Sequence, residues 1–243
     1  MSDYIGAELG LFQHATNWKR YYGKMVGPFL GREVLEVGAG LGANVPLFYQ
    51  GAPQRYVCLE PDAGLAAQIR AKVAAGRLPP DCEVVEGTLD SLPPGARFAS
   101  LLYVDVLEHI EDDRAEMRRA WARLRPGGHL VVLAPAHAFL FSPFDASIGH
   151  YRRYSRAALA ALVPAARVRL RYLDSLGLLL SLGNRLLLRQ PMPTLRQILF
   201  WDKRVIPISR LLDPLLGFTI GKSVLGIWKK PSENAPPPAE RAG

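Results

Sequence analysis

Three glycines alternate with other residues directly after a short apolar run, at positions 38, 40 and 42. The run at residues 34–37 suits a buried parallel strand, and glycines remove side chains where the chain turns sharply and a ligand approaches the backbone. The carboxylate of Glu60 follows about 20 residues later, at the expected end of the next strand, within reach of ribose hydroxyls. This spacing predicts a site for a ligand that contains adenosine.

Two kinds of adenosine ligand fit these residues. The pattern Gly38-x-Gly40-x-x-Ala43, with a later acid, also satisfies the fingerprint of dinucleotide-binding folds, so an NAD-dependent oxidoreductase is one interpretation. Glu36 favours a different ligand, because a carboxylate at this point can pair with the ammonium group of a zwitterion. No Tyr-x-x-x-Lys pattern, as expected of an NAD-dependent enzyme, follows the fourth predicted strand.

Three further motifs follow the glycine turn in order. They are Val106–Ile110, Leu124–Gly128 and the apolar run Leu130–Leu133. With the sequence Glu36-Val-Gly-Ala-Gly-Leu-Gly42, they make the chain resemble the class I S-adenosylmethionine-dependent methyltransferases, whose first motif reads acid-x-Gly-x-Gly-x-Gly. The resemblance covers roughly residues 30 to 175. It implies an α/β fold with a Rossmann-like, doubly wound sheet of seven mainly parallel strands and an antiparallel last strand, and S-adenosylmethionine as cofactor.

The resemblance also implies which residues contact the cofactor. They are Glu36, Gly38, Gly40, Asn44, Glu60, Pro61, Thr88, Leu89 and Asp105. Two positions depart from the family pattern. Thr88 stands where an acid often contacts the adenine amino group, so this contact passes to the Thr88 hydroxyl or to the Leu89 backbone. Ala99 replaces an acid that is common just before the fourth strand.

Methyl transfer releases a neutral thioether from the sulfonium, so the protein mainly positions the acceptor and removes its proton where it has one. The segment from Asp145 to Ser155 is rich in His, Tyr and Arg and follows the fifth strand, where the family's substrate residues commonly lie. We expect catalytic roles for His150, His109 and Asp145, and acceptor contacts from Tyr22, His137, Tyr151, Arg152 and Arg153. In the alternative interpretation, Ser155 caps a helix, the tyrosines pack on its first turn and the arginines are solvated.

A metal site is a further possibility in this region. Asp105, Glu108 and His109 have i, i+3, i+4 spacing, which places them on one face of a helix, and His137 can complete the set. Some methyltransferases of this class use such a metal to orient hydroxyl groups. The Leu-Glu-His element is also frequent in members that have no metal, where it shapes the floor of the pocket. We therefore expect no metal.

Apolar runs alternate with helical patterns through the region that carries these motifs. We expect strands at 34–37, 56–59, 83–85, 100–104 and 129–134, and helices at 44–50, 62–75 and 112–124. This alternation predicts a parallel sheet with helices on both faces. Residues 167–172 alternate polar and apolar, and residues 222–228 can pair with them as an antiparallel hairpin at the edge of the sheet.

We expect a single domain over residues 1–230 followed by a disordered tail at 231–243. Its parts are a helical lid at 1–30, the cofactor-binding core at 31–175, a basic, leucine-rich cap inserted at 176–221, and the last strand at 222–230. The cap suits an anionic lipid surface, a subunit interface, as in a homodimer, or a lid over an apolar acceptor. A helical cap that only packs on the sheet is the simplest alternative.

Charge is divided unevenly along the 243 residues. Residues 1–150 have 14 Lys and Arg against 17 Asp and Glu, whereas residues 151–243 have 16 against 5, so the second part has a net charge of +11. Such asymmetry is typical of proteins with anionic partners. The basic residues alternate with leucine rather than with stacking aromatics, which argues against nucleic acid. Two cysteines and no apparent leader predict a cytoplasmic protein, with peripheral membrane contact through the cap as an option.

We expect the protein to methylate a small molecule that has an apolar body and an acidic or phosphate group. Oxygen is the default acceptor atom. The alternatives are methylation at carbon or nitrogen of a prenyl or lipid-like substrate, the oxidoreductase, and a noncatalytic protein that binds a membrane surface.

Overall fold

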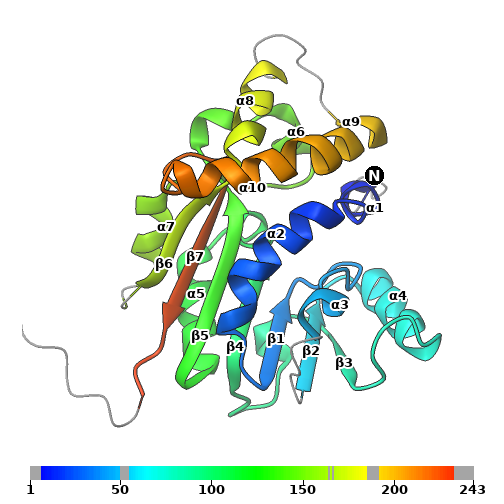
Figure 1. Ribbon diagram of the computed structural model, residues 1–243. Helices are drawn as coiled ribbons and strands as arrows, with labels where there is room; N and C mark the ends of the chain where they lie inside the picture. Colours follow the sequence, from blue (N-terminus) through cyan, green and yellow to red (C-terminus); the bar gives the residue numbers. More distant parts are fainter. Residues whose placement is uncertain (1–6, 50–54, 164, 166, 185–191, 233–243) are drawn as a thin grey trace, which may run out of the picture.

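A seven-stranded sheet in the order β3-β2-β1-β4-β5-β7-β6 runs through the computed structural model (Figure 1), which describes residues 7–49, 55–163, 165, 167–184 and 192–232. The strands are β1 (Glu33–Val37), β2 (Arg55–Glu60), β3 (Cys82–Glu86), β4 (Phe98–Val104), β5 (Leu124–Pro135), β6 (Arg167–Leu173) and β7 (Ser223–Lys229). Each strand predicted from the sequence overlaps one of these. The predicted Rossmann-like sheet with an antiparallel last strand is therefore confirmed.

Strand β1 lies at the point where the chain order reverses. It pairs in parallel with β2 on one side and with β4 on the other. Side chains alternate across the sheet, so Leu35 packs in the hydrophobic cluster on one face and Val34 in the cluster on the other. Burial on both faces explains why β1 reads as a continuous apolar run. A reversal point of this kind leaves a crevice at the carboxyl ends of the strands.

Strand β7 is inserted between β5 and β6 and is antiparallel to both. All of its residues except Lys229 are buried, which suits the apolar run from Val224 to Trp228. The expected pairing of residues 222–228 with 167–172 is confirmed, and β6 is the outermost strand. The segment between β6 and β7 returns to the carboxyl end of the sheet, where the cap lies.

Helices cover both faces of the sheet (Figure 1). Helices α5 (Asp113–Arg123) and α7 (Arg156–Leu162) pack on one face, where Met117 and Leu159 join the core. Helices α2 (Thr16–Val26) and α4 (Ala63–Ala74) pack on the other, through Trp18 and Ile69 among others. Helix α3 covers only Val45–Phe48 of the predicted 44–50, and Gln50 lies outside the described residues.

The cap and α1 (Ala7–Phe12) lie together over the carboxyl ends of the strands, and α2 runs from there along one face of the sheet (Figure 1). The lid consists of α1 and α2, and the cap consists of α8 (Ser175–Gly183), α9 (Leu195–Phe200), a π-helical turn (Trp201–Val205) and α10 (Ile206–Leu215). Among the described helices, none combines the length and the apolar composition that a transmembrane span requires. Residues 185–191 of the cap, and the expected tail from residue 233 on, lie outside the described residues.

Two fully buried aspartates attach the cap to the rest of the protein. Asp202 accepts hydrogen bonds from the backbone N–H groups at the start of α2, including that of Trp18 at 2.9 Å. Asp213 accepts the Tyr21 hydroxyl at 2.7 Å and the backbone N–H of Asp174 at 2.7 Å. Buried carboxylates need such donors, because an unpaired charge in the interior is costly. The lid and the cap are thus joined by hydrogen bonds as well as by aromatic packing.

Candidate functional site at the carboxyl ends of the strands

A cavity of about 260 Å³, which we call the turn cavity, lies at the carboxyl ends of β1, β4 and β5. Its wall includes Gly38 and Gly40 after β1, Asp105 after β4 and Pro135 at the end of β5. These segments meet because the chain order reverses between β1 and β4, which is where ligands bind in open α/β sheets. The site therefore lies where the sequence motifs predict it.

The glycine turn has backbone angles that side chains rarely adopt. Gly38 and Gly40 have φ values of 66° and 56°, and a Cβ at Gly38 would lie 2.6 Å from Val106 Cγ2. The N–H of Gly40 donates to Glu60 Oε2 at 2.7 Å, and Glu60 Oε1 accepts the N–H of Asp62 at 3.0 Å. The Glu60 carboxylate therefore holds the turn in place from behind. Burial raises the pKa of this carboxyl, although both backbone hydrogen bonds oppose the shift.

Glu36 lies behind the same turn, in a buried hydrogen-bond network. Its carboxylate accepts the Tyr56 hydroxyl and the Asn44 side-chain amide, each at 2.7 Å. The Tyr22 hydroxyl in turn donates to the Asn44 carbonyl oxygen. Burial raises the pKa of Glu36 to about 7, although the hydrogen bonds from Tyr56 and Asn44 act against the shift. Asn44 and Tyr22 line the turn cavity, and Glu36 supports them.

The predicted cofactor residues divide into two groups. Four of them line the turn cavity: Gly38, Gly40, Asn44 and Asp105. The other five, Glu36, Glu60, Pro61, Thr88 and Leu89, are not in its wall. Thr88 caps a short 3-10 helix over Leu89–Ser91 by accepting the N–H of Asp90, and the Leu89 side chain is buried. Cofactor contact stays a prediction for all nine residues.

Sequence reasoning missed several residues of the cavity wall. The lid contributes Leu9, Phe12, Gln13, Trp18 and Lys19, and the cap region contributes Ser181, Trp201 and Lys222. A Cβ at Gly40 would lie 3.4 Å from Leu9 Cδ1, so α1 lies close above the glycine turn. The one available signal was the roughly helical spacing of Phe12, Trp18, Tyr21 and Tyr22 within residues 3–30, which fits packing as well as ligand contact.

Asp145 is the centre of a charged cluster in the wall of the turn cavity, to which His109, His150 and Arg153 also belong. Its Oδ1 accepts His150 Nδ1 at 3.0 Å and Arg153 Nε at 2.8 Å, and its Oδ2 accepts the Ser142 hydroxyl at 2.7 Å. Burial would raise the pKa of Asp145, but the hydrogen bonds from His150 and Arg153 outweigh it and hold this pKa well below its usual range. The ionised Asp145 fixes the orientation of the His150 ring. The imidazole rings of His109 and His150, both predicted to be catalytic, lie in this cluster with their centroids 4.4 Å apart.

Glu108 lies next to the two histidines without a hydrogen-bond partner for either carboxylate oxygen among the described residues. It is fully buried, and its Oε1 lies 3.8 Å from His150 Nε2. Burial and the nearby Asp105 raise the pKa of Glu108 well above its usual range, and burial lowers that of His109 to about 4. Glu108, His109 and His150 place ligand atoms within 4.8 Å of one another, so these three can hold a divalent cation. Asp105 and His137, from the metal set weighed above, are not in this group.

Three predicted acceptor residues lie away from the turn cavity. Tyr151 is exposed, and Arg152 pairs with Asp113 at 2.7 Å. The Nε2 of His137 donates to the carbonyl oxygen of Gly221 at 2.9 Å. Tyr22 and Arg153 are the predicted acceptor residues that line the turn cavity.

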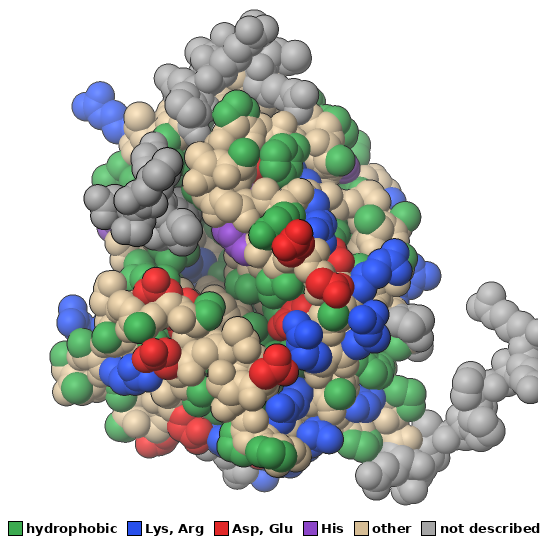
Figure 2. Space-filling model, turned by 180° about the vertical axis from the view of Figure 1, so that it is seen from behind, with side chains coloured by type: hydrophobic (Ala, Val, Ile, Leu, Met, Phe, Trp, Pro, Cys, Tyr) green, Lys and Arg blue, Asp and Glu red, His purple; other side chains and the backbone are tan. Residues whose placement is uncertain are grey.

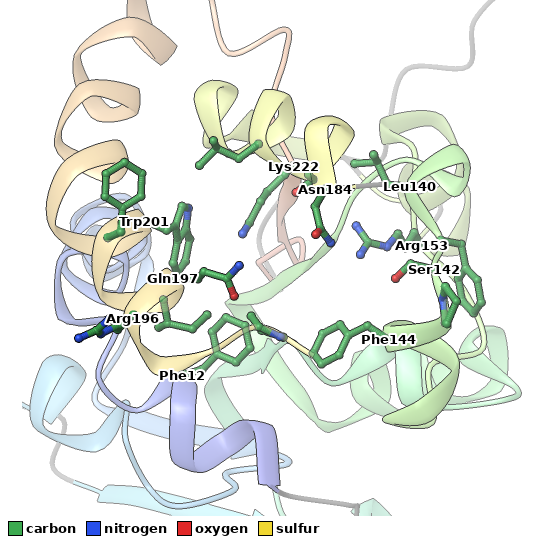
Figure 3. A pocket seen from close by; sticks show the side chains of 18 residues that line it. Phe12, Leu140, Ser142, Phe144, Arg153, Asn184, Arg196, Gln197, Trp201 and Lys222 are labelled. Carbon is green, nitrogen blue, oxygen red and sulfur yellow. The ribbon is translucent and has the colours of Figure 1, made fainter. Parts of the chain in front are cut away.

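A second, larger cavity of about 660 Å³, the cap cavity, adjoins the first beneath α8 and α9. Both cavities share Phe12, Phe144, Arg153, Ser181, Trp201 and Lys222 in their walls. Figure 3 shows Lys222, Arg153 and Gln197 reaching toward the same space, which Phe12 and Phe144 also line. Lys222 Nζ lies 3.9 Å from the centre of the Trp201 ring. The site is therefore a pair of connected chambers with basic groups at their junction.

Comparison with known proteins agrees with this geometry. The family model described as a methyltransferase domain matches residues 13–175. A protein of Mycolicibacterium smegmatis, named as a probable S-adenosylmethionine-dependent methyltransferase, is 31% identical over 157 residues, which are 63% of this chain and 57% of that relative. The chain thus spans little more than half the length of this curated relative.

Two solved structures share the fold. The YcgJ protein of Bacillus subtilis has a TM-score of 0.58 at 18% identity, covering 87% of this chain and 98% of its own. Phosphoethanolamine N-methyltransferase 2 of Haemonchus contortus, in complex with S-adenosylmethionine, has a TM-score of 0.63 at 12% identity, covering 93% and 58%. The family match covers well over half of the chain, so the interpretation as an NAD-dependent oxidoreductase is set aside. The chain belongs to the methyltransferase domain family, and its fold is that of the class I S-adenosylmethionine-dependent methyltransferases.

Proposed function

We propose that this enzyme transfers the methyl group of S-adenosylmethionine to a hydroxyl oxygen of a small molecule with an apolar body and an anionic group. The observation that carries the proposal is the junction of the two cavities, where the wall of the turn cavity continues into that of the cap cavity. The cap cavity is lined mainly by apolar side chains, including Leu140, Phe144 and Ile198. An apolar acceptor body fits there, with its reactive end directed at the glycine turn.

Lys222 is the cation that suits the anionic group of the acceptor. Arg153 is held by the Asp145 carboxylate through two hydrogen bonds, at 2.8 and 3.0 Å. Lys222 Nζ, in contrast, lies 3.9 Å from the nearest Asp174 oxygen, which is beyond hydrogen-bond distance. Burial lowers the pKa of Lys222, with Asp174 acting in the opposite direction. An anionic acceptor group would therefore gain a charge-assisted hydrogen bond from Lys222.

His150 is suited to remove the proton of the hydroxyl group. The Asp145 carboxylate accepts a hydrogen bond from His150 Nδ1, so the neutral imidazole ring has its proton on Nδ1. The other ring nitrogen, Nε2, is then free to accept a proton. In the proposed step the hydroxyl oxygen forms a bond to the methyl carbon, the carbon–sulfur bond breaks, and S-adenosylhomocysteine leaves. The hydroxyl proton passes to His150 Nε2 and then to solvent. Removal of such a base typically reduces the rate by about 10²–10⁴-fold.

The test is S-adenosylhomocysteine release with a panel of hydroxyl compounds that vary in apolar length and in the presence of a carboxylate or phosphate. We expect turnover with the apolar anionic compounds, a loss of kcat of at least about 100-fold in His150→Gln, and unchanged S-adenosylmethionine affinity. His129→Gln is the matched control, since His129 packs against Phe29 at the far end of β5 and lines neither cavity. Turnover only with amines would show that the acceptor atom is nitrogen rather than oxygen. Full activity of His150→Gln would show that His150 is not the catalytic base.

A chelator experiment tests whether Glu108, His109 and His150 bind a divalent cation instead. If His150 acts as a base, turnover is the same with and without EDTA. If EDTA abolishes turnover and one divalent cation restores it, the three residues Glu108, His109 and His150 bind that cation instead, and the base role is wrong.

A further inference from the structure

Helix α10 buries two polar side chains and exposes several apolar ones. Ser209 and Asp213 are fully buried, together with Ile206, which joins the hydrophobic core. The Ser209 hydroxyl donates to Asp174 Oδ1 at 2.7 Å, and Asp213 accepts the Tyr21 hydroxyl and two backbone N–H groups. The helix is therefore anchored to the protein by buried hydrogen bonds as well as by Ile206. Most of its other apolar side chains remain turned outward.

The outward side of α10 carries Ile208, Leu211 and Leu215, with exposed fractions of 50, 67 and 82%. Their i, i+3, i+7 spacing places them in one stripe along the helix. Leu216 and Ile220, directly after the helix, are also more than two fifths exposed. These five side chains, which we call the docking face, do not line either cavity. A contiguous apolar stripe of this kind on a surface indicates an interaction site.

Exposed basic residues flank the docking face. Lys203, Arg204 and Arg210 are all exposed, and by helical spacing Arg204 lies next to the apolar stripe. The only acids between residues 176 and 221 are Asp202 and Asp213, and both are buried as hydrogen-bond acceptors. On the face of the molecule in Figure 2, by contrast, acidic and basic side chains lie side by side. Positive charge is thus concentrated where the apolar side chains emerge.

We propose that the docking face binds the surface of a bilayer that contains anionic lipid, with α10 lying in the plane of the interface. An apolar stripe flanked by Lys and Arg is the pattern of interfacial helices, since the stripe enters the acyl boundary and the cations meet the headgroups. A second copy of this chain fits less well, because a two-fold contact would bring Arg204 and Arg210 near their own copies. The proposal does not depend on the acceptor or on methyl transfer.

The test is sedimentation of the full chain with sucrose-loaded vesicles of phosphatidylcholine alone and with about 30% phosphatidylglycerol. We expect binding to the anionic vesicles that weakens with added salt, because electrostatic attraction to the headgroups is screened. Leu211→Gln/Leu215→Gln should weaken binding at least tenfold, and Arg204→Gln/Arg210→Gln should remove the preference for anionic lipid. Val168→Gln, which changes an exposed apolar residue on β6, is the control and should bind as the parent does.

All substituted residues are exposed, so folding is expected to persist, and circular dichroism melts verify it for each variant. Three outcomes would overturn the proposal. They are no binding to anionic vesicles, binding that the leucine double variant leaves unchanged, and a concentration-dependent dimer that the same double variant dissolves. Because no cofactor or acceptor is present, none of these outcomes bears on the proposed methyl transfer.

Discussion

The cluster around Asp145 gives the most quantitative prediction, for the substitution Asp145→Asn. The fully buried carboxylate accepts two hydrogen bonds at Oδ1 and three at Oδ2, from His150, Arg153 and Ser142. Whichever oxygen becomes the amide nitrogen of asparagine, at least two donors then face a donor. Breaking a buried pair typically costs about 3–5 kcal/mol. We expect the free energy of unfolding at pH 7 to fall by about 3 kcal/mol or more.

The pH dependence of this loss provides a stricter test. The folded-state pKa of Asp145 lies below its unfolded value of 3.8, so its contribution to stability is complete above that value and is lost as the pH falls below it. Urea unfolding at pH 7 and pH 3, followed by circular dichroism, measures the difference between the parent and Asp145→Asn at each pH. This difference should shrink at pH 3. Glu86→Gln is the control, because the Glu86 ion pair with Arg70 is exposed and spans 3.5 Å. A loss below about 1 kcal/mol at pH 7, or an equal loss at both pH values, would refute the reasoning.

Three further predictions concern the turn and the junction of the cavities. Gly38→Ala should lower the melting temperature and weaken S-adenosylmethionine binding, since its Cβ would meet Val106 at 2.6 Å. The double variant Gly38→Ala/Val106→Ala should recover part of the melting temperature and of the affinity. No recovery would contradict the steric cause. The pKa of Glu36, raised to about 7, implies that the unliganded protein loses stability as the pH rises from about 4.5 to 7, by up to about 3 kcal/mol. Glu36→Gln should flatten that slope in urea unfolding, and an unchanged slope would assign it to another group. Lys222→Met should raise the KM for an anionic acceptor at least tenfold without changing S-adenosylmethionine affinity in calorimetry, whereas an unchanged KM would exclude Lys222 from acceptor binding.

Local sequence signals were sufficient for the sheet and for the glycine turn. Buried parallel strands such as β1 require continuous apolar runs, and the φ values of Gly38 and Gly40 require glycine. The strand and the turn can therefore be predicted from the local sequence alone. Topology then brings Asp105 to the same crevice, because parallel strands end at one edge of the sheet.

Contacts made across the fold could not be read in the same way. Lys222 follows a long insertion and lines the cavities only because β7 is placed between β5 and β6. The role of Glu60 in holding the N–H of Gly40 depends on how two strands end side by side. The exposed apolar stripe of α10 could not be predicted from the sequence either. A leucine-rich pattern does not show which side of a helix faces the protein, and only the buried partners of Asp213 determine it.

The most direct test of the account is calorimetric titration of the protein with S-adenosylmethionine, S-adenosylhomocysteine and NAD, with Glu60→Ala alongside. We expect the two sulfur ligands to bind with affinities of roughly micromolar Kd, and Glu60→Ala to weaken both, since the variant frees the glycine turn that Glu60 holds through Gly40. NAD should not bind. Binding of NAD alone, or binding of no ligand by a folded protein, would contradict the assignment of the cofactor site at the carboxyl ends of the strands.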